Sequence, residues 1–415
     1  MRNTAIHVVM LVAAIVALVS ASLAQGQPAK AAAKVDPRVV AANTDFGFKL
    51  FKQFVRGSGG KNVVMSPASV SLALSMTFNG AAGSTKNAMG KALGYSNVSL
   101  DEINAGNKAL MQNLMQPGPG VEVSIANSLW GRRGVQFKPE FLKRNKGFYQ
   151  AEVVALNFNS PTAKDKINSW VSDKTYGKIK SIIDSIDPLS ILFLVNAVYF
   201  NGKWTVPFDK ALTKDHDFTL ADGKAIKVPM MFRHGDYEYT QGDGFQLIKL
   251  NYGAAGRIGM YVLLPGKGSN LGELYKQLTR ANWDQWIGQA KGRSADVNLW
   301  LPKFKADYRV QAKDALSAMG MGIAFDAIRA DFTAMCPIPP SPNVFIGEVI
   351  HKAVVEVDEQ GTVAAAATAV GMRATAMPGP RPQPVSMVVD HPFFFAIRDD
   401  VTGEILFLGS ITDPR

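Results

Sequence analysis

Hydrophobic residues recur at helical spacing in the first part of the chain. The segment TDFGFKLFKQFVRG carries an apolar stripe formed by Phe48, Leu50, Phe51, Phe54 and Val55. A period of this kind predicts an amphipathic helix, because every third or fourth side chain then lies on one face. Asn43 or Thr44 is expected to cap this helix at its start.

A second helix is predicted in the segment SPASVSLALSMTFNGAAG. Ser66 can accept a hydrogen bond from the first helical turn, and Pro67 suits the first helical position. Gly80 is expected to mark its end. The segment GSTKNAMGK that follows has the composition of a phosphate-binding loop but not its spacing, so we interpret it as an ordinary helix start.

Apolar runs of strand length dominate the later part of the chain. The runs SILFLVNAVYF and RIGMYVLLPG predict buried strands, and DVNLWLPKFKADY alternates apolar and polar residues until Pro302. HPFFFAIRDDVTGEILFLGSI predicts two strands joined by a turn at residues 400–403. Helices followed by mostly antiparallel strands indicate the α+β class, and no repeat or linker divides residues 41–415 into several domains.

Residues 1–24 have the features of an export signal. Arg2 precedes the apolar run VVMLVAAIVALV, and small residues at Ser22 and Ala24 suit a cleavage site. An uncleaved membrane anchor is the alternative, because the run is just long enough to span a bilayer. Residues 25–40 are expected to form a disordered lead-in. The chain is therefore predicted to be secreted, into an extracellular or periplasmic space.

Composition predicts a large core without metal or disulfide. The chain has 415 residues, 47% of them hydrophobic, and a single cysteine, Cys336, which excludes an intramolecular disulfide. No Cys/His cluster has metal-ligand spacing, and no cofactor is predicted. The common hydrolase and nucleotide-binding motifs are missing, so an enzyme is not expected. An exported hydrolase remains an alternative, because a Ser/His/Asp triad can assemble from distant residues.

The net charge of +11 raises the question of a polyanionic partner. The densest basic segment, GRRGVQFKPEFLKRNKGFY, interleaves aromatic and basic residues, as nucleic-acid sites do. Phe137, Phe141 and Tyr149 nevertheless fall at helical spacing, so an amphipathic helix with a solvated basic face explains the segment better. No specific nucleic-acid partner is predicted, and polyanion binding stays open.

An unusual stretch, EQGTVAAAATAVGMRATAMPGPRPQP, runs from Glu359 to Pro384. It contains small and β-branched residues and no large aromatic one, between Gly361 and a proline cluster. Taken alone it fits a flexible linker or a helix, since alanine is the best helix former.

Five motifs together resemble the serpins, the serine protease inhibitor family. They are NVVMSPASVSLALSMTFNGAAGST, INSWVSDKTYGKIKSII, LFLVNAVYFNGKWTVPF, VIHKAVVEVDEQGTVAAAAT and DHPFFFAIRDDVTGEILFLGSITDP, and they occur in the family's order from about Asp45 to Pro414. The resemblance implies a monomer with one α+β domain, in which helices pack on three mostly antiparallel β-sheets. It also implies an exposed reactive-centre loop, from about residue 359 to residue 386, and a metastable native fold.

By this resemblance the alanine-rich stretch is the hinge of the reactive loop, which inserts into the central sheet after a protease cuts it. Inward-facing positions of such a segment must be small and uncharged, and strand alternation would turn Thr362, Ala364 and Ala366 inward. The predicted hinge residues are Glu359, Gly361, Thr362, Ala364, Ala365, Ala366, Ala367 and Thr368. Small residues here resemble inhibitory members, whereas bulky, charged or proline residues would indicate a non-inhibitory chaperone or carrier.

The scissile bond is predicted between Thr375 and Ala376, at the family's usual spacing from the hinge, with Arg373 and Met377 as alternatives. Counting back from HPFF points to Arg381 instead, but proteases rarely cut a bond that is followed by proline. The proline cluster also lacks the N–H groups that a central strand needs. A small residue before the cut favours an elastase- or subtilisin-like serine protease as partner. A cut after Arg373 would indicate a trypsin-like one.

The resemblance also assigns roles to polar residues that would otherwise be costly in a core. One group is expected to form a hydrogen-bonded cluster beneath the central sheet: Ser66, Ser69, Asn196 and His351. A second group is expected at the top of the sheet, where insertion begins: Trp204, Lys303 and Glu359, with the last two paired. None of these residues is predicted to be catalytic, because the protease supplies the chemistry.

Overall fold

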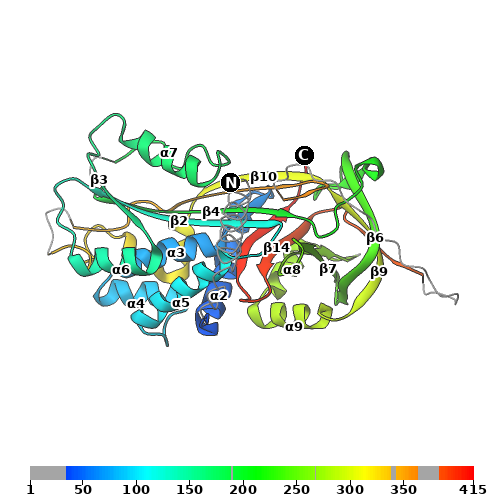
Figure 1. Cartoon of the computed structure of the whole chain (residues 1–415), viewed down its shortest axis with the longest axis horizontal. Coiled ribbons are helices and arrows are strands. Elements are labelled where there is room, and N and C mark those ends of the chain that lie inside the picture. Colours follow the sequence, from blue (N-terminus) through cyan, green and yellow to red (C-terminus); the bar gives the residue numbers. More distant parts are fainter. Residues whose placement is uncertain (1–33, 188–189, 267, 338–342, 363–382) are drawn as a thin grey trace, which may run out of the picture. The chain divides into compact units, whose positions relative to one another are not determined.

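Helices dominate the first part of the computed structural model and strands the second, which confirms the α+β class (Figure 1). The structure describes residues 34–187, 190–266, 268–337, 343–362 and 383–415. Residues 35–415 cluster into one compact unit. Its helices are α2 (Pro37–Gly57), α3 (Pro67–Phe78), α4 (Gly83–Ala92), α5 (Leu100–Leu114), α6 (Pro139–Tyr149), α7 (Ala163–Lys174), α8 (Leu271–Gln277), α9 (Arg280–Ala290) and α10 (Lys313–Leu316), with short turns η1 (Lys210–Leu212), η2 (Ser317–Met321) and η3 (Gly322–Phe325).

The first helix begins earlier than the sequence predicts. Asp36 caps α2 by accepting a hydrogen bond from the backbone N–H of Arg38 at 2.9 Å, and Pro37 occupies the first helical position. The prediction of a disordered lead-in is therefore wrong for residues 37–40. Asn43 and Thr44 lie buried inside the helix and do not cap it.

The second helix confirms its predicted start. The Ser66 side chain accepts a hydrogen bond from the N–H of Ser69 at 3.2 Å, and Pro67 is the first helical residue. The helix ends at Phe78, two residues before the predicted Gly80.

The strands form three sheets, as expected. They are β1 (Val63–Met65), β2 (Val121–Arg132), β3 (Glu152–Leu156), β4 (Leu192–Lys203), β5 (Lys214–Thr219), β6 (Ala225–Gly242), β7 (Phe245–Tyr252), β8 (Ile258–Pro265), β9 (Ser294–Pro302), β10 (Phe304–Gln311), β11 (Ile350–Val357), β12 (Gly361–Thr362), β13 (Val385–Val388), β14 (Phe393–Asp399) and β15 (Ile405–Ile411). The central sheet has the order β10-β11-β12-β4-β2-β3. The long strand β6 joins the other two, β1-β15-β14-β8-β7-β6 and β5-β6-β9-β13. The pairs β2–β3 and β9–β13 are parallel, and the other recorded pairs are antiparallel.

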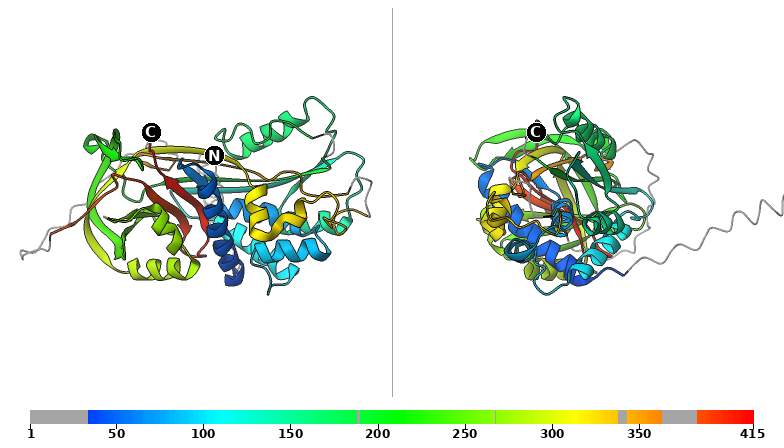
Figure 2. Two further views of the ribbon diagram at one scale, coloured as in Figure 1. Left: turned by 180° about the vertical axis from the view of Figure 1, so that it is seen from behind. Right: turned by 90° about the vertical axis from the view of Figure 1, so that its left-hand side faces the viewer.

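Both faces of the central sheet are covered. In Figures 1 and 2, α7 lies on one side of β2 and β4, and α3, α5 and α6 lie on the other. Val195 and Ala197 of β4 pack into the cluster under α7, whereas Val198 and Phe200 pack into the main core with α3 and α5. None of the helices in the described residues combines the length and apolar character needed to cross a membrane.

A buried carboxyl group lies where β14 turns into β15. Glu404 is 1% exposed, and Asn43 Nδ2 lies 3.3 Å from each of its oxygens. The neighbouring carboxylate of Asp399 is bound by Arg257, whereas no ion pair recorded among the described residues involves Glu404. Burial, reinforced by the charge of Asp399, raises the pKa of Glu404 to about 8.

This carboxyl group should make stability fall as the pH rises. The unfolded chain loses the Glu404 proton near pH 4.5, whereas the native protein keeps it until about pH 8. The free energy of unfolding should therefore fall by on the order of a few kcal/mol as the pH rises from 4.5 to 8. We expect Glu404→Gln to raise the melting temperature at pH 8.5 and leave it unchanged at pH 5, while the exposed Glu348→Gln has no effect at either pH. Destabilisation by Glu404→Gln at pH 8.5 would show that the fold requires the carboxylate.

Candidate functional site

The short strand β12 enters the central sheet between β11 and β4. Gly361 lies opposite Lys203 and Thr362 opposite Gly202 of β4, and Thr362 also lies opposite Val357 of β11. Beyond β12, the described residues include no pair between β4 and β11. We call the facing edges of these two strands the seam. The strand β12 therefore occupies the first positions of the seam, and Thr362 is the last residue described before residue 383.

Thr362 is held by a buried tyrosine. Its side chain faces the interior, is 2% exposed, and shares a hydrogen bond of 2.6 Å with the hydroxyl of Tyr252. The Tyr252 ring stacks on Trp204, with 4.3 Å between ring centroids. Tyr252 was not predicted from the sequence, because it lies 110 positions from Thr362 at the end of β7 and no local pattern connects them.

Gly361 occupies a position that only glycine fits. Its φ of 152° is rare for other residues, and a Cβ there would overlap the carbonyl oxygen of Gly202 and lie 2.8 Å from Lys203 Cα. Asp358 closes the preceding turn, since its Oδ1 accepts hydrogen bonds from the N–H groups of Gln360 at 2.8 Å and Gly361 at 3.2 Å. The predicted hinge glycine therefore lies where the backbone of β4 approaches most closely.

The residues expected at the top of the sheet do meet there. Lys303 Nζ lies 2.8 Å from one oxygen of Glu359, and the Thr213 hydroxyl donates to the other at 2.9 Å. Burial opposes ionisation, but the hydrogen bonds from Lys303 and Thr213 lower the pKa of Glu359 below its usual value. Trp204 donates its indole N–H to the carbonyl oxygen of Asp358 and its backbone N–H to that of Gln360, both at 2.9 Å.

The cluster expected beneath the sheet assembles in part. His351 of β11 accepts a hydrogen bond at Nε2 from the backbone N–H of Ser66 at 3.1 Å, and Ser66 in turn caps the helix at Ser69. Asn196 instead donates to Asn127 Oδ1 of β2 at 2.8 Å. No hydrogen bond among the described residues joins Asn196 to the other three. The role of Asn127 was not predicted, because an asparagine within a strand pattern does not indicate which residue of the next strand it contacts.

His351 is neutral at physiological pH. It is 4% exposed, and this burial lowers its pKa to about 4. A neutral imidazole can accept the N–H of Ser66, whereas a protonated one would present a second donor to it. The contact between α3 and β11 therefore requires the uncharged ring.

Several predicted residues lie outside the described part of the chain. They are the hinge residues Ala364, Ala365, Ala366, Ala367 and Thr368, the bond between Thr375 and Ala376, its alternatives Arg373 and Met377, and the export signal at residues 1–24. Their roles stay predictions.

Other candidate features carry no chemistry of their own. The second part of the basic segment forms α6, Pro139–Tyr149, with Phe141 and Tyr149 buried and Lys143 and Lys146 exposed, as an amphipathic helix requires. Phe137 precedes this helix, so its predicted place on the helical stripe is wrong. Burial raises the pKa of the Cys336 thiol to about 11, which disfavours a reactive thiolate. Within the described ranges, no group of three or more His, Cys, Asp and Glu side chains could hold a metal ion.

Comparisons with known sequences match nearly the whole chain. The family model described as serpin (serine protease inhibitor) matches residues 41–414. Serpin B8 from Homo sapiens is 36% identical over 379 residues, which cover 90% of this chain and 98% of that protein.

Solved structures with the same fold agree with this match. The native crystal structure of tengpin, a thermophilic serpin, superimposes with a TM-score of 0.82 at 31% identity and covers 92% of this chain and 96% of that chain. Native protease nexin-1 with heparin gives a TM-score of 0.80 at 29% identity and covers 91% of this chain and all (100%) of that chain.

The hydrogen bond between Thr362 and Tyr252 can be tested by a double-mutant cycle. Thr362→Val or Tyr252→Phe alone leaves one buried hydroxyl or its partner unsatisfied and should lower the free energy of unfolding by about 1–3 kcal/mol. The double variant removes both polar groups and should recover most of this loss. Denaturant unfolding of the four proteins measures the coupling, and strictly additive losses would contradict a direct bond.

Proposed function

This chain belongs to the serpin family, and from this premise we propose that it inhibits serine proteases as a suicide substrate and is not itself an enzyme. The observation that supports the proposal best is β12. Gly361 and Thr362 already pair between β11 and β4, so the chain that follows needs only to continue in the same direction to become a central strand.

The register of β12 predicts what the inserting residues would meet. Continued one residue at a time, it would place Ala364 between Val355 and Phe200, and Ala366 between Ala353 and Val198. These β11 residues are buried, so the inward positions of the hinge must be small.

The same register would bring Thr368 between His351 and Asn196. These are two polar residues of the predicted cluster beneath the sheet, and both are buried. A threonine hydroxyl at this inward position could bond to either of them, whereas alanine could not. This complementarity supports insertion of the loop along the whole seam.

The proposed reaction uses the protease's own chemistry. Its serine attacks the carbonyl carbon of Thr375, the bond to Ala376 breaks, and the new amine leaves with the C-terminal fragment. In the extended register Met372 would lie opposite Leu192, the first residue of β4, so the predicted cut falls just beyond the inserted strand. Insertion then carries the acyl-enzyme away before water hydrolyses it.

The proposal includes the partner and the compartment. A small residue before the cut favours an elastase- or subtilisin-like protease. The predicted export signal at residues 1–24 favours secretion to an extracellular or periplasmic space. The protein would act there as a monomer. Polyanion binding is a weaker proposal. It rests on the exposed lysines of α6 and on heparin in the structure of protease nexin-1.

Incubation of the full chain with elastase, subtilisin and trypsin tests this function. We expect a detergent-resistant complex with at least one of them. The mass of the released C-terminal fragment should correspond to a fragment that begins at Ala376. Cleavage by all three without a complex would indicate a non-inhibitory serpin, such as a chaperone or carrier. Turnover of ester or peptide substrates by the chain itself would indicate a hydrolase.

Ala364→Arg should convert the inhibitor into a substrate. Thr362 already lies inside the sheet, so Ala364 is the next inward-facing residue that must enter. Burying an unpaired guanidinium costs several kcal/mol, and about 1.4 kcal/mol of extra barrier slows insertion tenfold. Hydrolysis should then win, and the variant should be cut at the same bond while the protease stays active.

Gln383→Arg is the matched control, because it adds the same charge near the end of the proline cluster, outside the inserting segment. It should retain the stable complex. A stable complex with Ala364→Arg as well would contradict the hinge assignment.

A further inference from the structure

The segment that follows α7 crosses the seam. We call residues 175–187 the crossing segment. The Tyr176 hydroxyl donates to Glu122 of β2 at 2.7 Å, and its ring lies 4.6 Å from that of Tyr199 on β4. Two residues later, Lys178 Nζ lies 3.5 Å from Glu356 of β11. Near neighbours in the chain thus bind opposite sides of the seam.

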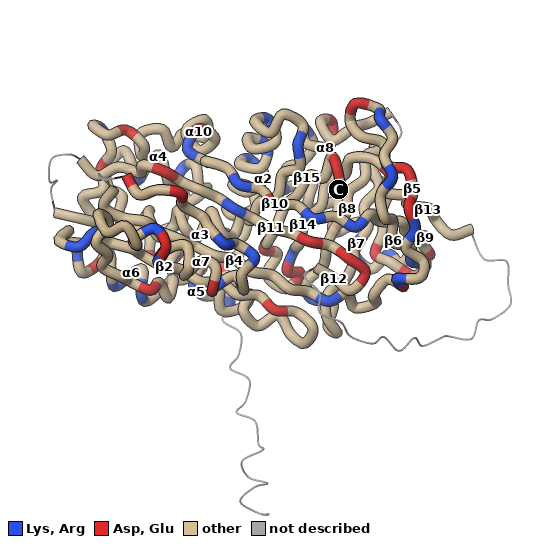
Figure 3. Tube along the Cα trace, turned by 90° about the horizontal axis from the view of Figure 1, so that it is seen from above, with Lys and Arg blue, Asp and Glu red and all other residues tan. Residues whose placement is uncertain are grey.

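A second ion pair binds the crossing segment to the β10 side. Arg309 of β10 lies 2.7 Å from Asp184 and also donates to the carbonyl oxygen of Ile182 at 3.3 Å. Charged residues occupy every second position of β10 from Lys305 to Arg309 and are exposed, so they can pair with what lies above the strand. Figure 3 shows Lys, Arg, Asp and Glu residues in the region of β10 and β11. We call Lys178–Glu356 and Arg309–Asp184 the tethers.

The attachment on the opposite side of the seam is much stronger. The crossing segment leads into β4 through the backbone, and α7 is preceded by β3, so both covalent connections lie on that side. Ile179, Ile182 and Ile183 are buried in one apolar cluster with Val195 and Ala197 of β4. On the β11 side the cluster touches only partly buried residues, Ile350 and Val354.

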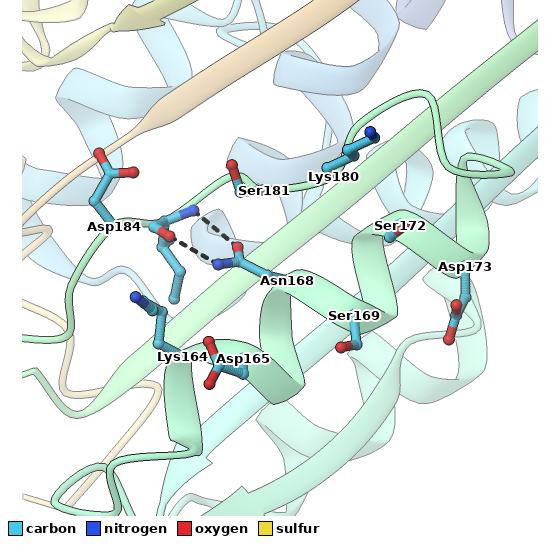
Figure 4. A pocket seen from close by; sticks show the side chains of 10 residues that line it. Lys164, Asp165, Asn168, Ser169, Ser172, Asp173, Lys180, Ser181 and Asp184 are labelled. Carbon is cyan, nitrogen blue, oxygen red and sulfur yellow. Dashed lines mark hydrogen bonds between the residues drawn. The ribbon is translucent and has the colours of Figure 1, made fainter.

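The crossing segment is also fixed to α7 on one side and open on the other. Figure 4 shows Asn168 of α7 bonded to the backbone of Ile183, at 2.9 Å to its carbonyl oxygen and 3.1 Å to its N–H. An open polar cavity of about 580 Å³ lies between α7 and residues 180–184 of the segment, with Asp184 on its wall. The Asp184 side chain is 72% exposed, so its tether to Arg309 is open to solvent.

The contacts of the crossing segment with β11 and β4 lie where insertion would have to continue. Glu356 directly precedes Val357, the partner of Thr362, and Tyr199 lies three residues from Gly202 on β4. A loop joined to a protease cannot be threaded beneath a closed segment. The loop can enter from the outer face only if the crossing segment releases β11 and β10, to which it is bound by ion pairs and not through the backbone.

We propose that Lys178 and Arg309 hold the crossing segment closed over the seam, and that breaking their ion pairs limits the rate of loop insertion. This inference rests on the proposed function. Both are positioning residues, since neither touches the protease or the scissile bond. Because the pairs are partly exposed, salt screens them, and each should change the insertion rate by about two- to fivefold.

Lys178→Met, Arg309→Met and the double variant test the proposal. Lys305→Met is the matched control, because Lys305 binds the same Glu356 carboxylate at 3.4 Å but belongs to β10 and not to the crossing segment. A labelled synthetic peptide with the sequence of residues 362–375 is added to each uncleaved full-length protein, and its rate of incorporation is measured. The number of inhibitor molecules consumed per protease molecule is measured in parallel.

We expect each single variant to take up the peptide about two- to fivefold faster than the wild type and to consume fewer inhibitor molecules per protease. The rate of peptide incorporation by the wild type should rise between 0.05 M and 0.5 M salt, and the double variant should lose this dependence on salt. Rates equal to those of the wild type or of Lys305→Met would overturn the tether proposal while leaving inhibition intact. Faster uptake with no protease complex in any variant would support the tethers and refute inhibition.

Discussion

A strand edge inside a sheet presents backbone N–H and C=O groups that need partners, and this requirement governs the central sheet of this serpin. β4 and β11 each pair with β12 for one or two residues, and no pair joins them directly among the described residues. A chain that continued from Thr362 would satisfy both edges at once. In the proposed mechanism, the free energy of these pairings would drive insertion.

The resting position of β12 is set by contacts at the top of the sheet. Tyr252 binds Thr362, and Lys303 with Thr213 neutralises Glu359. Tyr252, Thr362 and Glu359 are buried, so each bond to them also removes an unsatisfied donor or acceptor. These contacts of Glu359 and Thr362 hold β12 in register between β11 and β4. In our proposal, entry past this point is opposed by the crossing segment, which binds both sides of the seam.

Much of what surrounds β12 could be predicted from the sequence, whereas the hinge beyond Thr362 stays a prediction. A run of alanine and threonine after Gly361 indicates a segment selected for small size, and the motifs around Ser66, Asn196 and His351 place those residues in one family pattern. The helix at Ser66 and the strand pair at residues 393–411 follow from capping and turn chemistry, which act over a few residues. The start at Asp36 was missed, because the lead-in QGQPAKAAAKVD has no apolar stripe and resembles disorder until Val39 and Val40 are seen to be buried.

By itself, the sequence determined the fold class, the family resemblance and the pairing of Lys303 with Glu359, because these depend on local periodicity or on motifs whose order survives in the chain. Only the tertiary structure decided that Thr362 already lies in the sheet, that Asn196 bonds to Asn127, and that Tyr252 bonds to Thr362. It alone placed the crossing segment over the seam. These contacts join residues tens to hundreds of positions apart, and side-chain geometry between distant strands leaves no periodic trace in either partner.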